Sequence, residues 1–356
     1  MLIDPEALTR FVSEIFVRLD ANASDAGEVA THLVSANLKG HDSHGVGMVP
    51  AYVGNIRSGA LALNTHARLV RDKGATLLID GQMGFGQVVG REAVELAIER
   101  VKQTGVVAAG VRNCHHLGRI GHYGEICGRA GCVSMHFVNV VGHQPLVSPF
   151  GGRQARISTN PFCCVVPRSD DPPIVLDMAT SAIAQGKVRV AHMKGDKVPD
   201  GSLIDYEGKP TNDPRVMFEE PRGSLGPFGQ HKGYGLALMC ELLGGGLAGE
   251  WTAQAPSPER FTIVNHMLMI VLDPDLFGGA EAFSREVEEM TAYMRSTVPA
   301  AGVDRVRVPG EPELESMAER AAGGIPIDDN TWAAIVKSAQ VSGMTDGEIA
   351  GFTGSA

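Results

Sequence analysis

The chain has 356 residues, enough for one large hydrophobic core or for two to three domains of ordinary size. Hydrophobic residues make up 44% of it and charged residues 20%, which is typical of a globular protein. The formal net charge is −10, and there is no run of Lys and Arg, so the composition argues against a nucleic-acid partner.

The sequence shows no targeting or membrane segment. Its first residues, MLIDPEALTRFVSEIF, contain neither a basic region nor a continuous apolar stretch, so we expect no signal peptide. There is no apolar window of about eighteen residues, the length that a membrane span needs. The six cysteines form no CxxC pair, a pattern that favours reduced thiols. We therefore expect a cytoplasmic protein without a membrane partner.

The first forty residues predict two helices. Asp4-Pro5-Glu6 has the order of an N-cap, a first-turn proline and a first-turn acid, and apolar residues at helical spacing follow it. Residues 23–38 repeat the apolar pattern. A polar turn that is rich in glycine and histidine then occupies residues 40–45.

From about residue 66, strand and helix patterns alternate. Strands are expected at 75–80, 105–111, 132–141, 174–177 and 260–272, and helices at 88–104, 120–130, from about 180, at 235–247 and from about 280. Residues 195–227 are rich in turns. This alternation predicts an α/β or α+β fold.

One glycine-rich segment imitates a Rossmann phosphate loop. Gly84, Gly86 and Gly90 lie between a predicted strand and a predicted helix, where they could face a pyrophosphate, and Arg112 could face an NADP phosphate. The segment lies deep in the chain, however, and no further βαβ repeats follow it. We interpret it as a tight turn into a helix.

Several histidines lie in loops at the ends of predicted elements, where functional residues are more frequent than on an apolar helix face. They are His41, His44, His115, His116, His122 and His231. A surface or capping role is the alternative for each of them.

Six motifs occur in an order that points to a known family. They are Asp42-Ser43-His44-Gly45-Val46, Asn113-Cys114-His115-His116-Leu117-Gly118, Ser158-Thr159-Asn160-Pro161, Leu176-Asp177-Met178-Ala179-Thr180-Ser181, residues 201–214, and residues 229–235. Together they resemble the malate/L-lactate dehydrogenase family, which includes sulfolactate, ureidoglycolate and diketogulonate enzymes. The resemblance runs from about residue 5 to beyond residue 330.

The resemblance implies a fold and an activity. The fold is α/β, with a mixed and largely antiparallel sheet flanked by helices, and is unlike a Rossmann domain. The activity is an NAD(P)-dependent hydride transfer that interconverts 2-hydroxy acids and 2-oxo acids in a homodimer, with the choice between NAD and NADP left open. Residues 1–75 with 285–356 would form a helical domain, and residues 76–284 a cofactor-binding and dimerisation region.

The resemblance also implies site residues. His44 matches the catalytic histidine of some members and His116 that of others, so which of the two is the proton donor stays open. The segments that match cofactor contacts contain Thr159, Asn160, Pro161, Asp177, Met178, Ala179, Thr180, Ser181, His231, Lys232, Gly310 and Glu311.

The chemistry of the residues agrees with these roles. Reduction of a 2-oxo acid leaves an alkoxide, so a group with a pKa near seven must deliver a proton, and histidine is suited to this. We expect His44 to be that donor, with Asp177 orienting its ring. A helix that begins near Thr180, with its free N–H groups, and the charge of Lys232 would hold the pyrophosphate. A helix cap at Asp177, a plain turn at 159–161 and a solvated Lys232 are the alternatives.

The chain departs from many relatives at one substrate position. They read Ser-His-Gly-x-x-Arg, with the arginine placed to bind the substrate carboxylate, whereas this chain has Met48 after Ser43 and His44. A desolvated carboxylate needs a cation, and Arg119 is the candidate replacement; a surface arginine that caps a strand is its alternative. Met48 would then give an apolar wall beside the substrate, and larger apolar or aromatic 2-hydroxy acids would be favoured.

A metal-dependent hydrolase that uses His115, His116 and His122 is the rival interpretation. The sequence has no HExxH motif and no paired acidic ligands beside these histidines. We therefore expect no metal.

Overall fold

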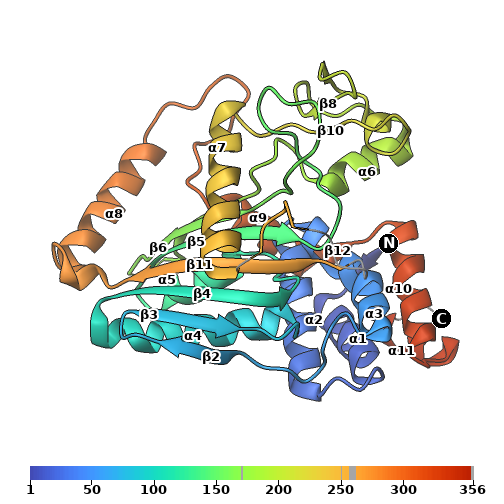
Figure 1. Ribbon diagram of the computed structural model, residues 1–356, viewed down its shortest axis with the longest axis horizontal. Coiled ribbons are helices and arrows are strands. Elements are labelled where there is room, and N and C mark those ends of the chain that lie inside the picture. Colours follow the sequence, from blue (N-terminus) through green and yellow to red (C-terminus); the bar gives the residue numbers. More distant parts are fainter. Residues whose placement is uncertain (170, 250, 256–261, 354–356) are drawn as a thin grey trace.

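A twisted sheet runs through the middle of the computed structural model, which describes residues 1–169, 171–249, 251–255 and 262–353 (Figure 1). In these residues the sheet has seven strands in the order β2-β3-β4-β11-β5-β6-β7. Their bounds are β2 Arg68–Asp72, β3 Thr76–Asp80, β4 Val106–His115, β11 Val264–Leu272, β5 Val133–Val141, β6 Phe162–Val166 and β7 Ile174–Met178. Only β3 and β4 pair in parallel. The predicted mixed, largely antiparallel sheet is confirmed.

Helices cover both faces of this sheet. On one face lie α4 (Gly86–Thr104) and α5 (Gly121–Arg129), and α4 is the crossover that makes β3 and β4 parallel. On the other face lies α7 (His231–Cys240), which continues as a π-helical segment, η4 (Glu241–Gly249), against β4, β5 and β11. The glycine-rich segment before α4 is the tight turn that we expected: Gly84, Gly86 and Gly90 all face close protein contacts.

A helical body packs beside the sheet. It contains α1 (Pro5–Val17), α2 (Ala23–Leu38), α3 (Val49–Ser58), α10 (Asp329–Val341) and α11 (Asp346–Thr353). The helices expected near the N-terminus are present, with Asp4 and Asn22 as their N-caps. The strands β1 (Leu2–Ile3) and β12 (Ile325–Pro326) pair, which brings the start of the chain to its last part.

The turn-rich residues form a small lobe of their own. It holds α6 (Gln185–Lys194), β8 (Leu203–Ile204), β9 (Pro210–Thr211) and β10 (Ser224–Leu225), together with a separate apolar core. The helix expected from about Thr180 is present as α6, but it begins five residues later, at Gln185. Ser181 instead pairs with Pro227 in an isolated bridge, so this stretch presents no helix N-terminus.

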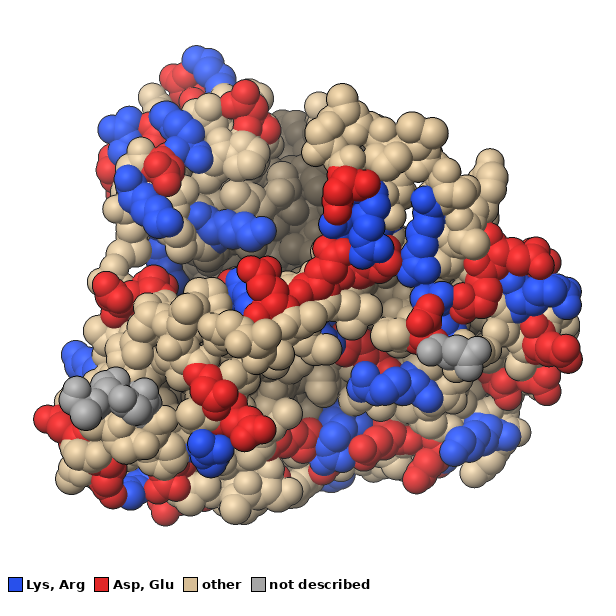
Figure 2. Space-filling view, turned by 180° about the vertical axis from the view of Figure 1, so that it is seen from behind, with Lys and Arg blue, Asp and Glu red and all other residues tan. Residues whose placement is uncertain are grey.

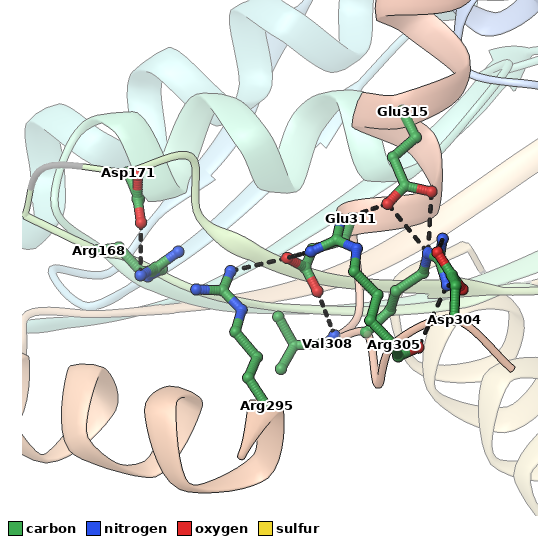
Figure 3. A network of polar contacts seen from close by, with 9 residues as sticks. Arg168, Asp171, Arg295, Asp304, Arg305, Val308, Glu311 and Glu315 are labelled. Carbon is green, nitrogen blue, oxygen red and sulfur yellow. Dashed lines mark hydrogen bonds and ion pairs between the residues drawn. The ribbon is translucent and has the colours of Figure 1, made fainter. Parts of the chain in front are cut away.

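The helix α8 (Ala280–Arg295) extends away from the sheet as an arm (Figure 1). Charged contacts hold it to the body: Arg295 donates to Glu311 at the start of α9 (Glu311–Gly323) over 2.8 Å, and Arg168 pairs with Glu288 (the first of these is drawn in Figure 3). Met290, Tyr293 and Val298 on and beyond α8 are exposed. The division into 1–75 with 285–356 and 76–284 stays a prediction.

None of the described helices combines the length and the apolar character that crossing a bilayer requires.

Candidate active site

His44 lies in a turn between α2 and α3 that side-chain hydrogen bonds hold in place. The turn consists of two short 3-10 segments, η1 (Asp42–His44) and η2 (Val46–Met48). Asn37 at the end of α2 holds both of them, because its amide nitrogen donates to Asp42 Oδ1 over 2.7 Å and its oxygen accepts from the Val46 backbone N–H over 2.8 Å. Arg320 from α9 also binds Asp42, with 2.7 Å between Nη1 and Oδ1. The backbone of His44 is thus fixed from two sides.

The structure brings the two candidate histidines together. The rings of His44 and His116 stack with their centroids 5.5 Å apart and an interplanar angle of 21°. The Nδ1 atom of His44 lies 2.9 Å from Ser43 Oγ. In the described part of the chain, the Nε2 atoms of both rings have no hydrogen-bond partner, so each can meet a ligand.

His116 is held by residues that the sequence did not single out. It follows β4, and its Nδ1 atom lies 2.7 Å from the hydroxyl oxygen of Tyr52 on α3. That hydroxyl in turn accepts from Gln87 Nε2 over 2.7 Å. Gly86, next to Gln87, allows the close approach, because a Cβ there would lie 2.3 Å from the His116 carbonyl oxygen. Neither Tyr52 nor Gln87 belongs to one of the six motifs, so no sequence signal marked them.

Both histidines are neutral at neutral pH. Burial, together with the nearby His41 and Arg119, lowers the pKa of His44 to about 4. Burial also brings the pKa of His116 well below its usual value, with His44, His115 and His143 contributing. Each ring therefore has one bare nitrogen, which can accept a proton or a hydrogen bond.

The guanidinium of Arg119 is buried and only partly paired, because Nη1 has no hydrogen-bond partner among the described residues. Its side chain is only 2% exposed, and Nη2 donates to Glu125 Oε1 over 2.6 Å. Lys39, which directly follows α2, binds the other oxygen of Glu125. Burial by itself would raise the pKa of Glu125, but Arg119 and Lys39 outweigh it and hold this pKa below its usual value. The structure thus places Arg119 in a buried ion pair, and its contact with the substrate stays a prediction.

Asp177 does not contact His44 either. Its Oδ2 accepts from the Gly121 backbone N–H over 2.7 Å and lies 3.7 Å from Arg119 Nη1. Burial raises the pKa of Asp177, and the positive charge of Arg119 opposes that rise. The contact that we expected between Asp177 and His44 is absent. Ser43 contacts the His44 ring instead, and Asp177 fixes the start of α5.

The predicted cofactor segments converge, but several of their side chains are used within the protein. The Thr180 N–H donates to the Thr159 carbonyl over 2.9 Å, and the Phe228 N–H donates to the Thr180 carbonyl over 3.0 Å. The side chain of Asn160 is fully buried and donates to Glu241 Oε2 over 2.6 Å. The hydroxyl groups of Thr180 and Ser181 donate to backbone carbonyls. These polar side chains position the backbone and are not free for a pyrophosphate.

Other members of the predicted set remain accessible. His231 and Lys232 are exposed at the start of α7, and Pro161, Met178 and Ala179 are half-buried.

The loop before α9 supports β7. The Val175 N–H donates to the Pro309 carbonyl over 3.1 Å, and Gly310 has a φ of 97°, in the left-handed region that favours glycine. The carboxylate of Glu311 accepts from the Val308 N–H and from Arg295 (Figure 3). Glu311 therefore stabilises its own loop.

A deep hollow separates the small lobe from the part of the molecule that carries α7 and α8 (Figure 2). On the lobe side, the first turn of α6 packs against the His44 turn: a Cβ at Gly186 would lie 3.3 Å from Ser43 Cβ. A small cavity of about 20 Å³, room for one water molecule, is lined by Val141, Ile157, Trp251, His143 and Ser158 among others. His143 lies near enough to His116 to affect its pKa.

The three histidines of the hydrolase alternative do not form a metal site. His115 accepts from Asn55 Nδ2 over 2.8 Å at its Nε2 atom, His116 faces Tyr52, and His122 lies against the ring of His32 with 4.4 Å between centroids. In the residues that the structure describes, no three potential ligands come together to hold a metal ion. This alternative has no support.

Comparison with known proteins decides the family. The family model for malate/L-lactate dehydrogenase matches residues 3–336. The chain belongs to the malate/L-lactate dehydrogenase family. It is thus an oxidoreductase of the hydroxycarboxylate dehydrogenase kind, as its six motifs predicted.

Relatives in this family match the chain over nearly its whole length. Hydroxycarboxylate dehydrogenase B of Escherichia coli is 45% identical over 98% of this chain and 96% of its own. L-lactate dehydrogenase of Cupriavidus necator is 41% identical over 96% of this chain and 97% of its own. The solved structure of sulfolactate dehydrogenase from Methanocaldococcus jannaschii has a TM-score of 0.87 and is 33% identical, covering 97% of this chain and 98% of its own.

Two glycines near the His44 turn should respond oppositely to alanine. A Cβ at Gly45 would lie 2.1 Å from Asn37 Oδ1, so Gly45→Ala must displace the buried amide that holds the turn. We expect a loss of about 1–3 kcal/mol in the free energy of unfolding. Gly54→Ala on the open face of α3 meets nothing within 4 Å and should stabilise by about 0.5–1 kcal/mol. Urea unfolding of both variants measures this, and equal effects would contradict the role of Asn37 in holding the turn.

Replacement of Arg119 should affect stability before it affects substrate binding. Arg119→Leu leaves Glu125 and Asp177 buried without their arginine, and we expect a loss of about 3–5 kcal/mol in the free energy of unfolding. Arg129→Leu is the control: Arg129 is 59% exposed and lies 3.8 Å from Glu125, so less than about 1 kcal/mol should be lost. A stable Arg119→Leu protein whose only defect is a raised KM for 2-oxo acids would restore the substrate role.

Proposed function

We propose that the protein is an NAD(P)-dependent dehydrogenase that interconverts 2-hydroxy acids and 2-oxo acids, with His44 as the group that moves the proton. The observation that carries the proposal is the stacked pair of His44 and His116, two neutral rings whose Nε2 atoms have no partner among the described residues. Membership in a dehydrogenase family, with relatives named for lactate, sulfolactate and hydroxycarboxylates, supports it.

The residues around the hollow fit a nicotinamide cofactor, either NAD or NADP. Exposed His231 and Lys232 at the start of α7 offer positive charge and N–H groups to phosphates. Pro161, Met178 and Ala179 offer half-buried apolar surface to a ring. When bound, the nicotinamide ring would accept or donate the hydride.

The protein's own residues then handle the proton and the substrate. In the oxidation direction, the bare Nε2 of His44 accepts the proton of the 2-hydroxyl group, and in the reduction direction the protonated ring returns it to the 2-oxo oxygen. Ser43 lies beside His44 and faces the first turn of α6, which covers the substrate from the lobe side. His116 contacts the same substrate oxygen.

We propose that the substrate has a larger apolar or aromatic side chain. Met48 is only partly buried and ends the His44 turn, where many relatives carry an arginine. An uncharged thioether at this position fits a hydrocarbon side chain better than a second carboxylate.

We also propose that the protein works as a cytoplasmic homodimer. Its cysteines are free thiols, as a reducing compartment would keep them. Exposed Met239, Leu242 and Leu247 on α7 and η4, together with the apolar residues of the α8 arm, are the surface that a second copy would cover.

His44→Asn should lower turnover with phenylpyruvate by about 10²–10⁴-fold, because a general acid–base group is lost. The nicotinamide absorbance measures turnover with NADH and with NADPH, and fluorescence titration should show cofactor binding unchanged. His66→Asn is the control, since His66 pairs with Glu92 at an exposed position outside the proposed site. If His44→Asn keeps its activity and His116→Asn loses it, the two roles are reversed.

The pH profile should reflect the low pKa of His44, about 4. Oxidation needs the unprotonated ring, so its kcat/KM should stay level as the pH falls from 8 to about 5.5. Reduction needs the protonated ring, so its kcat/KM should rise about tenfold for each pH unit that the pH falls over the same range. A drop in oxidation below about pH 6.5, the usual histidine value, would show that His44 is not shielded in this way.

A further inference from the structure

A chain of buried hydrogen bonds leads from α4 through α3 to His116. Gln87, Tyr52 and His116 are 1%, 0% and 7% exposed. The Gln87 amide nitrogen lies 2.7 Å from the Tyr52 hydroxyl oxygen, and that oxygen lies 2.7 Å from His116 Nδ1. Buried polar groups of this kind need partners, so the direction of each bond is constrained by the others.

Counting hydrogens determines that direction. A phenol has one hydrogen, and its oxygen accepts the hydrogen that Gln87 Nε2 donates. The hydrogen of Tyr52 therefore points to its other neighbour, Nδ1 of His116. An Nδ1 atom that accepts carries no hydrogen, so the neutral ring has its hydrogen on Nε2.

His44 is under no such constraint. Its Nδ1 faces Ser43 Oγ, and a serine hydroxyl can donate or accept. Either nitrogen of His44 can therefore carry the hydrogen, as a group that gives and regains a proton requires. The two stacked rings thus differ in what their Nε2 atoms can do.

We propose that Tyr52 and Gln87 are positioning residues that hold His116 with its hydrogen on Nε2, so that His116 donates a hydrogen bond to the substrate oxygen while His44 alone moves the proton. This rests on the proposed function. His116 then stabilises the negative charge that develops on the oxygen during reduction, in the manner of an oxyanion-hole donor.

The orientation of the Gln87 amide determines the direction of both hydrogen bonds in the chain from Gln87 through Tyr52 to His116, which we call the relay. Its Oε1 is buried and has no partner among the described residues. With an acceptor in place of Nε2, the Tyr52 hydrogen would turn to residue 87, and His116 would have to donate from Nδ1, leaving Nε2 bare. Gln87→Glu makes this change with almost no change in shape.

The protonation of the His116 ring can be observed directly. Long-range ¹H–¹⁵N correlation spectra of histidine-labelled protein distinguish a protonated ring nitrogen from a bare one, and the His116→Asn spectrum assigns the signals. In the wild type we expect the hydrogen of His116 on Nε2. In Gln87→Glu we expect it on Nδ1. A wild-type ring protonated at Nδ1 would overturn the proposal.

Kinetics provide the second readout. Tyr52→Phe removes the hydroxyl that orients His116, and we expect kcat for 2-oxo acid reduction to fall about ten- to 100-fold, with the cofactor KM unchanged. Tyr123→Phe is the matched control: Tyr123 is an equally buried phenol that donates to the Leu117 carbonyl over 2.5 Å, and its loss should leave the His116 hydrogen on Nε2. Unchanged kcat and an unchanged His116 spectrum in Tyr52→Phe would contradict the relay.

The two proposals fail separately. If no 2-oxo acid is reduced with either cofactor, the proposed function is wrong, while the spectra still report the state of His116. If Tyr52→Phe does not fold, the wild-type and Gln87→Glu spectra still decide the relay.

Discussion

The side chain of Tyr52 contacts both the helical body and the sheet. Its ring lies in the helical core beside Phe16 and Phe85, with centroids 6.2 and 6.3 Å away, while its hydroxyl reaches His116 at the end of the sheet. A fully buried hydroxyl without hydrogen-bond partners would destabilise the fold. The helical body and the sheet must therefore keep the relative position in which the Tyr52 hydroxyl has its partners. The same relative position places the His44 turn, which belongs to the helical body, over His116. The candidate site therefore depends on how two packed units meet.

Buried charges near the contact between the helical body and the sheet also hold these two units together. Lys39 after α2 and Arg119 after β4 share the carboxylate of Glu125 on α5, so one ion-pair network joins the helical body to the sheet. Such a network contributes less to stability than its bond count suggests, because removing the charges from water is costly. It also acts electrostatically: the positive charge of Arg119 helps to lower the pKa of His44 and opposes the rise that burial causes in the pKa of Asp177.

The structure changes how several family residues are understood. Asn160 and Thr180 lie in segments that match cofactor contacts, yet their side chains bond to Glu241 and to backbone carbonyls. These side chains fix the backbone of their segments. Glu311 acts in the same way on the loop before α9. Matching a motif thus identified candidate segments without showing which of their side chains are used within the protein.

The order of the motifs and the helical spacing were enough to predict the family, the mixed sheet, the first two helices and the segments that carry His44 and His116, because these are encoded locally along the chain. The relation between residues far apart in sequence was decided only by tertiary packing. Asp177 was expected beside His44 but lies against Gly121, and Arg119 was expected to be free but pairs with Glu125, since burial forces each charge to find a partner among whatever side chains the fold brings near. Tyr52 and Gln87 carry no signal at all in the sequence. A tyrosine and a glutamine on separate helices become parts of one hydrogen-bonded chain only when α3 and α4 meet at the end of β4 and water is excluded between them.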